Sequence, residues 1–183
     1  MLLTELAIPG LLHLVPKRHG DHRGFFAEVF KASILEGAGF NDVFIQDNHS
    51  MSAEVGTVRG LHFQKPPFAQ AKLVRVVRGA IFDVALDLRR NSPTCGQHVS
   101  VELSADNGAQ LLVPDGFAHG FCTLEPNTEV IYKVTRYYSR EAESGVLWSD
   151  PDLGIAWPLG PRSAVISDKD ATLPRLRDMN FRF

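Results

Sequence analysis

Short apolar runs rich in Val, Ile, Leu and Phe recur along the whole chain, and turn-forming Gly, Pro, Asn and Asp separate them. Short runs at such regular intervals are typical of an all-β sandwich or barrel. The pattern therefore predicts a mainly β protein whose strands form an antiparallel jelly roll. The predicted strands are Val43 to Asp47, Val58 to Gln64, Ala71 to Arg78, Ala80 to Leu88, Gln97 to Leu103, Ala109 to Val113, His119 to Thr123 and Glu129 to Tyr137.

Helical signals are confined to two places in the chain. Ser33 followed by Glu36 is a capping-box pattern, and it predicts a short helix over Lys31 to Gly37. The segment from Asp168 to Asp178 is predicted to hold one further helical turn. Asp170 in this segment has a plain structural interpretation, as a carboxylate at the start of that turn. We expect both helices to flank the β-structure.

Length, charge and cysteine content narrow the classes of function. The 183 residues contain no repeat or linker, so we expect a single domain over residues 1–183. The net charge is -2 and the basic residues are scattered, which argues against a nucleic-acid surface and favours a small-molecule partner. Apolar runs are far shorter than the roughly 20 residues of a membrane helix, and no signal sequence is recognisable. With Cys95 and Cys122 far apart, we expect reduced thiols and a cytoplasmic protein.

Alternation within the predicted strands indicates which polar side chains face the barrel interior. Lys72 shares a strand face with Val74 and Val76, so the pattern places an ammonium among apolar neighbours. Such a lysine either extends its amine to solvent at a strand edge or stabilises a developing oxyanion. Tyr132 shares a face with Val130, and it is either a core tyrosine with a satisfied hydroxyl or an acid. Alternation alone leaves both choices open.

Two histidines that follow glycine-containing turns form the clearest candidate site. His62 lies in the segment Arg59 to Gln64, and His119 lies in the segment Pro114 to Gly120. The similar turns predict that the two imidazoles line opposite walls of one pocket, and Gly60 leaves space beside His62. Two imidazoles are too few ligands for a closed metal site, so the pair favours acid and base chemistry. Each histidine by itself has an alternative interpretation as a hydrogen-bonded structural residue.

Ordered motifs along nearly the whole chain carry a resemblance to a known family. They are Asp21-His22-Arg23-Gly24-Phe25-Phe26-Ala27-Glu28, Gln46-Asp47-Asn48-His49-Ser50, Val58-Arg59-Gly60-Leu61-His62-Phe63-Gln64, Lys72-Leu73-Val74-Arg75, Asp83 to Asp87, Ser92-Pro93-Thr94, Pro114 to Phe121, Tyr132-Lys133, Trp148-Ser149-Asp150-Pro151 and Ser167 to Asp170. In these segments the chain resembles the dTDP-4-dehydrorhamnose 3,5-epimerase (RmlC) family of the cupin superfamily. The resemblance implies a cupin-type antiparallel jelly-roll β-barrel with short flanking helices.

The resemblance also implies an enzyme that needs no cofactor or metal and inverts C3 and C5 of a 4-keto-6-deoxy sugar carried on dTDP. Both carbons lie next to the C4 ketone, so either proton can leave if the resulting enolate is stabilised. By this likeness His62 is the base and Asp170 orients it, as a carboxylate fixes an imidazole tautomer. Tyr132 would return a proton from the opposite face, and Lys72 would stabilise the enolate oxygen.

A set of substrate-binding residues follows from the same likeness. It contains arginines for the diphosphate, aromatic rings that stack on thymine, polar side chains for the thymine edge or deoxyribose, and a sugar-binding histidine with a supporting carboxylate. In that order they are Arg23 and Arg59, Phe26 and Tyr138, Glu28, Gln46 and Asn48, and His119 with Asp83. In this family the N-terminal strand reaches into a neighbouring subunit, so Phe26 and Glu28 would complete the partner's site. We therefore expect a homodimer.

Three other functions are compatible with parts of the pattern. The chain could be a single-site epimerase that acts at C3 or C5 only, because the same His and Tyr serve both kinds of enzyme. It could be a metal-dependent cupin if Gln64, Glu102 or Asp83 supplied a third ligand. It could also be a binding module without chemistry, although the combination of a base, an acid and an inward lysine argues against that function.

Overall fold

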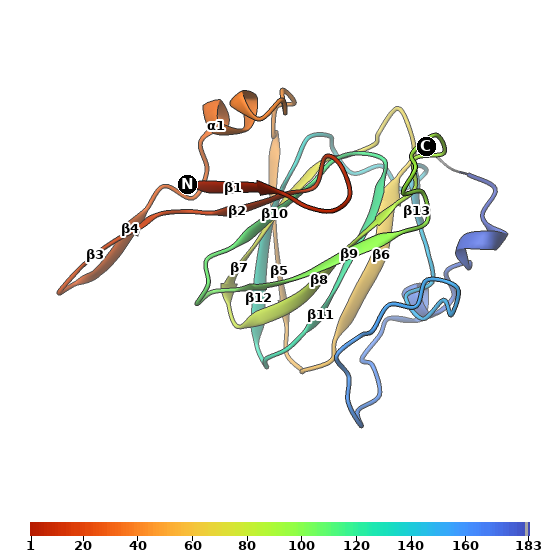
Figure 1. Cartoon of the computed structure of the whole chain (residues 1–183). Helices are drawn as coiled ribbons and strands as arrows, with labels where there is room; N and C mark the ends of the chain where they lie inside the picture. Colours follow the sequence, from red (N-terminus) through yellow and green to blue (C-terminus); the bar gives the residue numbers. More distant parts are fainter. Residues whose placement is uncertain (182) are drawn as a thin grey trace.

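Two antiparallel sheets face each other and enclose the core of the protein (Figure 1). The computed structural model describes residues 1–181 and 183. In this part of the chain, one sheet has six strands in the order β1 (Leu2–Glu5), β2 (Leu12–Val15), β10 (Gln110–Val113), β7 (Lys72–Arg78), β12 (Thr128–Val134) and β5 (Gln46–Ser52). The facing sheet has five, in the order β13 (Glu143–Gly145), β6 (Val58–Gln64), β11 (Phe117–Thr123), β8 (Ala80–Asp87) and β9 (His98–Ser104). The predicted antiparallel, mainly β jelly roll is confirmed.

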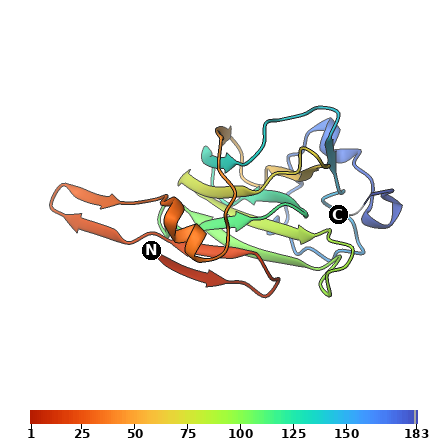
Figure 2. The same ribbon diagram turned by 90° about the horizontal axis from the view of Figure 1, so that it is seen from above.

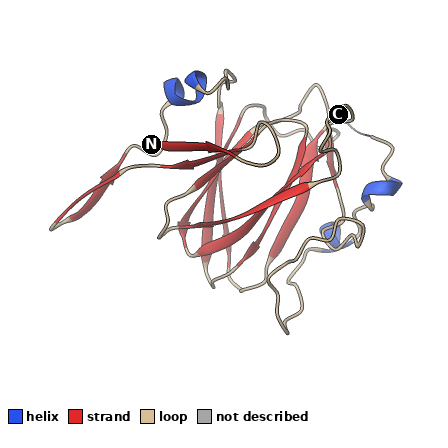
Figure 3. Cartoon of the chain, in the orientation of Figure 1, coloured by secondary structure: helices blue, strands red, loops and turns tan. Residues whose placement is uncertain are grey.

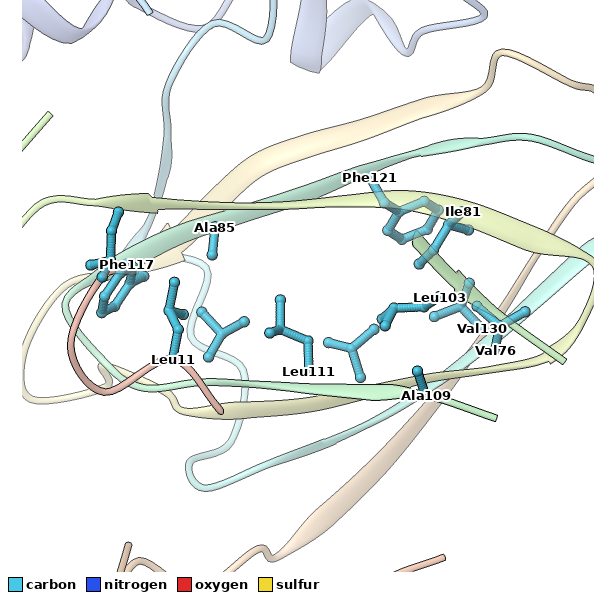
Figure 4. Close-up of a cluster of buried hydrophobic side chains, with 13 residues drawn as sticks. Leu11, Val76, Ile81, Ala85, Leu103, Ala109, Leu111, Phe117, Phe121 and Val130 are labelled. Atoms are coloured by element: carbon cyan, nitrogen blue, oxygen red, sulfur yellow. The ribbon is translucent and has the colours of Figure 1, made fainter. Parts of the chain in front are cut away.

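The principal core lies between the two sheets (Figure 4). Val76 and Val130 project into it from the six-stranded sheet, and Ile81, Ala85 and Phe121 meet them from the five-stranded sheet. Each of these side chains is at most 5% exposed, and full burial of one aliphatic side chain stabilises a fold by about 1.5–3 kcal/mol. Alternate residues of β7 share a face, so the inward position of Val76 also directs the side chain at the start of that strand, Lys72, into the interior.

Two further clusters lie on the outer faces of the sheets. Leu35 of helix α1 (Ala32–Gly37) packs with Leu73 and Leu112 on the six-stranded sheet. On the five-stranded sheet, Leu61 and other buried residues contact aromatic side chains of the C-terminal segment. This segment carries helix α2 (Asp168–Ala171) and the 3-10 helix η1 (Leu176–Asp178), so its packing brings α2 to the end of the barrel.

Seven of the predicted strands correspond to observed strands with small shifts of their ends, but the strand predicted over Val43 to Asp47 is wrong. The observed strand β5 is Gln46–Ser52, which is polar at most positions. Val43 and Ile45 are exposed, while Phe44 packs against the cluster below α1. The apolar run is therefore a loop that covers the helix, and the strand that follows it carries little hydrophobic signal.

The helices lie at the periphery, as predicted (Figure 3). The residue preceding α1 is Lys31, and no side chain caps the helix, so the capping box predicted at Ser33 is wrong because Ser33 lies inside the helix. The predicted turn in the tail is confirmed by α2, whose N-cap is Ser167 rather than an aspartate. The Ser167 hydroxyl accepts a hydrogen bond from the backbone N–H of Asp170 at 3.2 Å.

Strands β3 (Arg18–Asp21) and β4 (Gly24–Ala27) form a two-stranded arm that projects from the body of the molecule (Figures 1 and 2). Phe25 and Phe26 are 61% and 68% exposed on this arm. At its base, the Arg18 guanidinium donates to the backbone carbonyl of Asp106 at 2.6 Å. An isolated hairpin is marginally stable in water, so these exposed rings mark the arm as a surface for contact.

Within the described residues, no helix is long and apolar enough to span a membrane. Cys95 is exposed and Cys122 is buried, and both are free thiols, as expected.

Candidate active site

A polar pocket of about 330 Å³ opens between the two sheets, beside helix α2. Its lining combines two histidines, a lysine and a tyrosine with charged residues from β6 and the tail. The lining residues are Ser50, Arg59, His62, Lys72, His119, Phe121, Val130, Tyr132, Ser167, Lys169 and Asp170. All four predicted catalytic residues therefore meet in one pocket, although 108 positions separate His62 from Asp170 in the chain.

His62 and His119 lie side by side rather than on opposite walls, which corrects the prediction. They are direct cross-strand partners in the neighbouring strands β6 and β11. Lys72 and Tyr132 reach the pocket from β7 and β12 of the facing sheet, as their strand faces predicted. The imidazoles therefore form one wall, and the ammonium and the phenol belong to the other.

A β-bulge in β6 brings Arg59 to the same pocket as His62. Strict alternation would send these two side chains to opposite faces, but Gly60 and the residue after it lie opposite the single residue Gly120 of β11. A Cβ at Gly60 would lie 2.6 Å from the Cα of Gly120, and its φ of 124° also favours glycine. The missing side chain at Gly60 therefore makes room for the neighbouring strand β11, which corrects the expectation that it leaves space beside His62 for a ligand.

His62, which is partly exposed, and the buried Asp170 form a dyad at the pocket wall. The His62 Nε2 atom lies 2.7 Å from Oδ1 of Asp170, which is 4% exposed. Oδ2 of the same carboxylate accepts the backbone N–H of Gly60 at 3.1 Å. Burial acts to raise the pKa of Asp170, but the hydrogen bonds and charge of His62 and the Gly60 N–H lower it overall. An ionised Asp170 holds Nε2 as the protonated nitrogen and leaves Nδ1 to accept a proton.

Lys72, on β7, is the partly buried cation that lines the pocket. Its Nζ donates to the backbone carbonyl of His62 at 3.5 Å. Burial lowers the pKa of Lys72 to about 8, while the negative charges of Asp83 and Glu143 oppose that decrease. The side chain therefore remains an ammonium at neutral pH, in a site where its charge is poorly screened.

Tyr132 supplies the phenol of the pocket. Burial raises its pKa, against the opposing effects of the Arg59 charge and a hydrogen bond with Asn48. Tyr132 is therefore protonated at neutral pH and can donate a proton from the sheet that faces His62.

A second dyad is buried in the pocket wall, and its histidine, His119, lines the pocket. The His119 Nε2 atom is 2.8 Å from Oδ1 of Asp83, which is fully buried in β8. The prediction that Asp83 supports the polar residues of the site agrees with this placement, although its carboxylate does not line the pocket itself.

A chamber of about 190 Å³ adjoins the pocket, and His62, Lys72 and Tyr132 line both spaces. Its other lining residues are Asn48, Phe63, Gln64, Gln70, Tyr138 and Glu143. Gln64 is occupied with the backbone, because its amide nitrogen donates to the carbonyl of Phe68 at 2.8 Å. Gln46 does not line the chamber itself, but its Nε2 donates to Oδ1 of Asn48, which does, at 2.7 Å.

Sequence reasoning missed Glu143 and Lys169. Lys169 lines the pocket and Glu143 lines the chamber, and the two side chains form an ion pair. The Tyr138 hydroxyl donates to Oε2 of Glu143 at 2.8 Å. Lys169 could have been noticed as the neighbour of Asp170, whereas Glu143 lies in a short strand without any periodic pattern.

The arm residues in the predicted substrate-binding set lie outside both spaces of their own chain. Arg23 has a side chain that is 78% exposed, and its guanidinium pairs with Asp21 at 2.6 Å. Phe26 and Glu28 lie on or beside the same arm. The structure thus gathers Arg59, Asn48, His119 and Tyr138 around the dyads, but it does not bring the arm residues to them. Within the described residues, no group of three or more His, Cys, Asp and Glu side chains is arranged to hold a metal ion.

Comparison with known proteins identifies relatives over the full chain. A sequence model of the family described as dTDP-4-dehydrorhamnose 3,5-epimerase matches residues 5–178. The dTDP-4-dehydrorhamnose 3,5-epimerase of Sinorhizobium fredii is 50% identical over 183 residues, which are 100% of this chain and 93% of that protein.

Solved structures agree with this relationship. The dTDP-4-dehydrorhamnose 3,5-epimerase of Bacillus anthracis, with TDP and PPi bound, is 54% identical with a TM-score of 0.92, and the match covers 96% of this chain and 99% of that one. The dTDP-6-deoxy-D-glucose-3,5-epimerase of Legionella pneumophila, in complex with dTDP-4-keto-L-rhamnose, is 44% identical with a TM-score of 0.93, over 98% and 94% of the two chains. The resemblance inferred from the motifs and the fold that it implied are confirmed.

Proposed function

The chain belongs to the dTDP-4-dehydrorhamnose 3,5-epimerase family, and from this premise we propose that it converts dTDP-4-dehydro-6-deoxy-D-glucose to dTDP-4-dehydro-L-rhamnose. One observation carries the proposal. A base, His62, and a phenol, Tyr132, reach the same pocket from facing sheets, with the Lys72 ammonium among them. Inversion of a carbon requires a proton acceptor on one face and a proton donor on the other.

Each inversion is a removal and a return of one proton next to the C4 ketone. His62 takes the proton through Nδ1 while Asp170 stabilises the imidazolium, and the electron pair moves to the C4 oxygen. Lys72 stabilises that oxyanion by charge and hydrogen bonding. Tyr132 then donates its hydroxyl proton to the carbon from the other face, which restores the ketone. Exchange with solvent returns a proton to the phenolate and removes the one held by His62.

The nucleotide half of the substrate occupies the side of the site near Arg59 and Tyr138. The Arg59 guanidinium lines the pocket and suits the diphosphate, because its planar fork can engage two oxygens. Tyr138 is 60% exposed and lines the chamber with Asn48, whose amide accepts a hydrogen bond from Gln46. The Tyr138 ring can stack on thymine while these amides meet the base edge or the deoxyribose. His119 and its partner Asp83 serve the sugar.

The active form is a homodimer in which each arm completes the site of the other subunit. The exposed Phe26 and the solvent-directed Arg23 lie on a projecting hairpin, which supports this arrangement. In that position Arg23, Phe26 and Glu28 add contacts to the diphosphate and thymine that one chain alone lacks.

We also propose a cytoplasmic location and a reaction without cofactor. The free thiols support the location, and the acid and base residues of the chain account for each proton transfer.

The configuration of the product tests this function. The purified protein is incubated with dTDP-4-dehydro-6-deoxy-D-glucose, and NMR of the sugar ring reports the configuration at C3 and C5. Inversion of both carbons is expected. Inversion of one carbon would identify a single-site epimerase instead, and an unchanged sugar would overturn the proposal. Activity lost to a chelator and restored by Fe, Zn or Mn would favour a metal-dependent reaction.

A further inference from the structure

Asp83 has a free carboxylate oxygen inside the barrel. Its side chain is 0% exposed, Oδ1 contacts Nε2 of His119 at 2.8 Å, and Oδ2 has no hydrogen-bond partner among the described residues. Alternation along β8 places Asp83 on the same face as Ile81 and Ala85, which belong to the core between the sheets. A buried carboxylate oxygen without a partner is unfavourable unless a positive charge lies nearby.

Lys72, on the opposite sheet, has fewer hydrogen-bond acceptors than its ammonium can use. It follows the inward face of β7 together with Val74 and Val76. Its ammonium has three donors, but the described residues provide it with a single hydrogen bond, to the His62 carbonyl at 3.5 Å. The barrel interior thus contains a partly buried cation with one weak hydrogen bond and a buried carboxylate oxygen without a hydrogen-bond partner among the described residues.

The other carboxylates near Lys72 are already paired. The charged and titratable groups around it are His62 and Arg59 on β6, Asp83 on β8, His119 on β11, Tyr132 on β12, Tyr138 after β12, Glu143 on β13, and Lys169 and Asp170 on α2. Asp170 is bonded to His62, and Glu143 is paired with Lys169. Among these carboxylates, Asp83 is the one with an oxygen, Oδ2, that has no hydrogen-bond partner among the described residues. Its negative charge can therefore balance the positive charge of Lys72.

We propose that Asp83 is a positioning residue that keeps Lys72 an ammonium at the C4 oxygen of the sugar, while its other oxygen fixes the His119 ring. The contact with C4 rests on the proposed function, whereas the effect of Asp83 on Lys72 is a property of the free protein. Of the charges that oppose the decrease of the Lys72 pKa, Asp83 has the largest effect and Glu143 the next.

The proposal is tested by titrating Lys72 itself. The ε-carbon of Lys72 is followed by ¹³C NMR against pH in the substrate-free protein, and the signal is assigned by its loss in Lys72→Met. The midpoint is expected at about 8 in the unmodified chain and about one pH unit lower in Asp83→Asn. Glu143→Gln is the matched control, since it also removes one negative charge near Lys72, and a smaller decrease is expected. If Asp83→Asn does not fold, Asp83→Ser serves in its place.

Equal decreases in the two variants, or an unchanged midpoint without Asp83, would overturn the assignment. These results do not depend on turnover, so they are separate from a failure of the epimerase proposal. In the active protein, a structural role of Asp83 would lower kcat/KM equally at all pH values. A positioning role instead predicts that the alkaline limb of kcat/KM in Asp83→Asn shifts to lower pH together with the Lys72 midpoint. Above that midpoint, kcat/KM should fall about tenfold for each pH unit.

Discussion

His62 and His119 are direct cross-strand partners, yet each imidazole is held by a different carboxylate. Asp170 reaches His62 from helix α2 at the pocket mouth, and Asp83 reaches His119 from the neighbouring strand β8. Each of the two adjacent histidines is thereby given its own carboxylate partner, which fixes its tautomer. The His62 side chain is 30% exposed, as the proposed base must be to reach a substrate, whereas the His119 side chain is buried at 8%.

Replacing His62 by Asn should abolish proton exchange and turnover. General base catalysis contributes about 10²- to 10⁴-fold, and the described pocket offers no second base in the same position. The loss is measured as kcat/KM with the nucleotide sugar. The unfolding temperature is the control and should change little, because the His62 side chain is 30% exposed. Activity within tenfold of the unmodified chain would show that His62 is not the base.

Replacing Tyr132 by Phe should separate proton removal from completed inversion. The variant retains His62, Asp170 and Lys72, so exchange with solvent deuterium at one carbon is expected to survive. Inverted product should decrease strongly, because the phenol that donates from the opposite face is absent. NMR of the same sample measures exchange and configuration together. Equal loss of both signals would contradict the role of Tyr132 as the acid.

The rate should fall as the pH rises through about 8, because Lys72 loses its proton there. Its pKa is lowered from the usual value by burial, so the charged form that stabilises the enolate is present below pH 8 and lost above it. The pH profile of kcat/KM reports this ionisation in the free enzyme. In Lys72→Arg, whose side chain stays charged, the residual activity should lack this alkaline limb. A limb that persists unchanged would assign it to another group.

Mixed dimers should reveal whether the arm acts in the partner's site. One subunit carries His62→Asn, and the other carries Arg23→Ala with Phe26→Ala, and the two are coexpressed with different tags. If the arms are exchanged, the mixed dimer contains one site with an intact base and an intact arm. Random pairing should then restore roughly a quarter of the unmodified activity, although each variant alone is inactive. No recovery in isolated mixed dimers would place each arm in its own subunit's site.

Strand alternation correctly predicted the inward positions of Lys72 and Tyr132, since β7 and β12 are regular where they pass the pocket. Strict alternation does not account for the shared pocket of Arg59 and His62, because the bulge opposite Gly120 changes the face of β6 between them. A bulge depends on which strand is the neighbour, and that information is absent from local periodicity.

Polar strands were harder to predict than apolar ones. Asn48 lines the chamber and Ser50 lines the pocket from β5, so that strand has few apolar residues and the apolar pattern places it too early, at Val43. The arm strands β3 and β4 are exposed on nearly every residue and show no alternation at all. Their pairing is visible only in the folded chain.

Pairings across the chain required either the structure or the family motifs. Asp170 meets His62 because the tail packs over the five-stranded sheet and returns to the barrel mouth. The pairing of Glu143 with Lys169 arises from the same return of the chain, and no motif indicated it.

The most direct test of the central claim is deuterium incorporation from heavy water. The protein is incubated with dTDP-4-dehydro-6-deoxy-D-glucose in D₂O, without added metal or nicotinamide, and the sugar is analysed by NMR and mass spectrometry. Removal of protons by His62 and their return by Tyr132 predict deuterium at both C3 and C5. A sugar that leaves the incubation with no deuterium at either carbon would contradict the account.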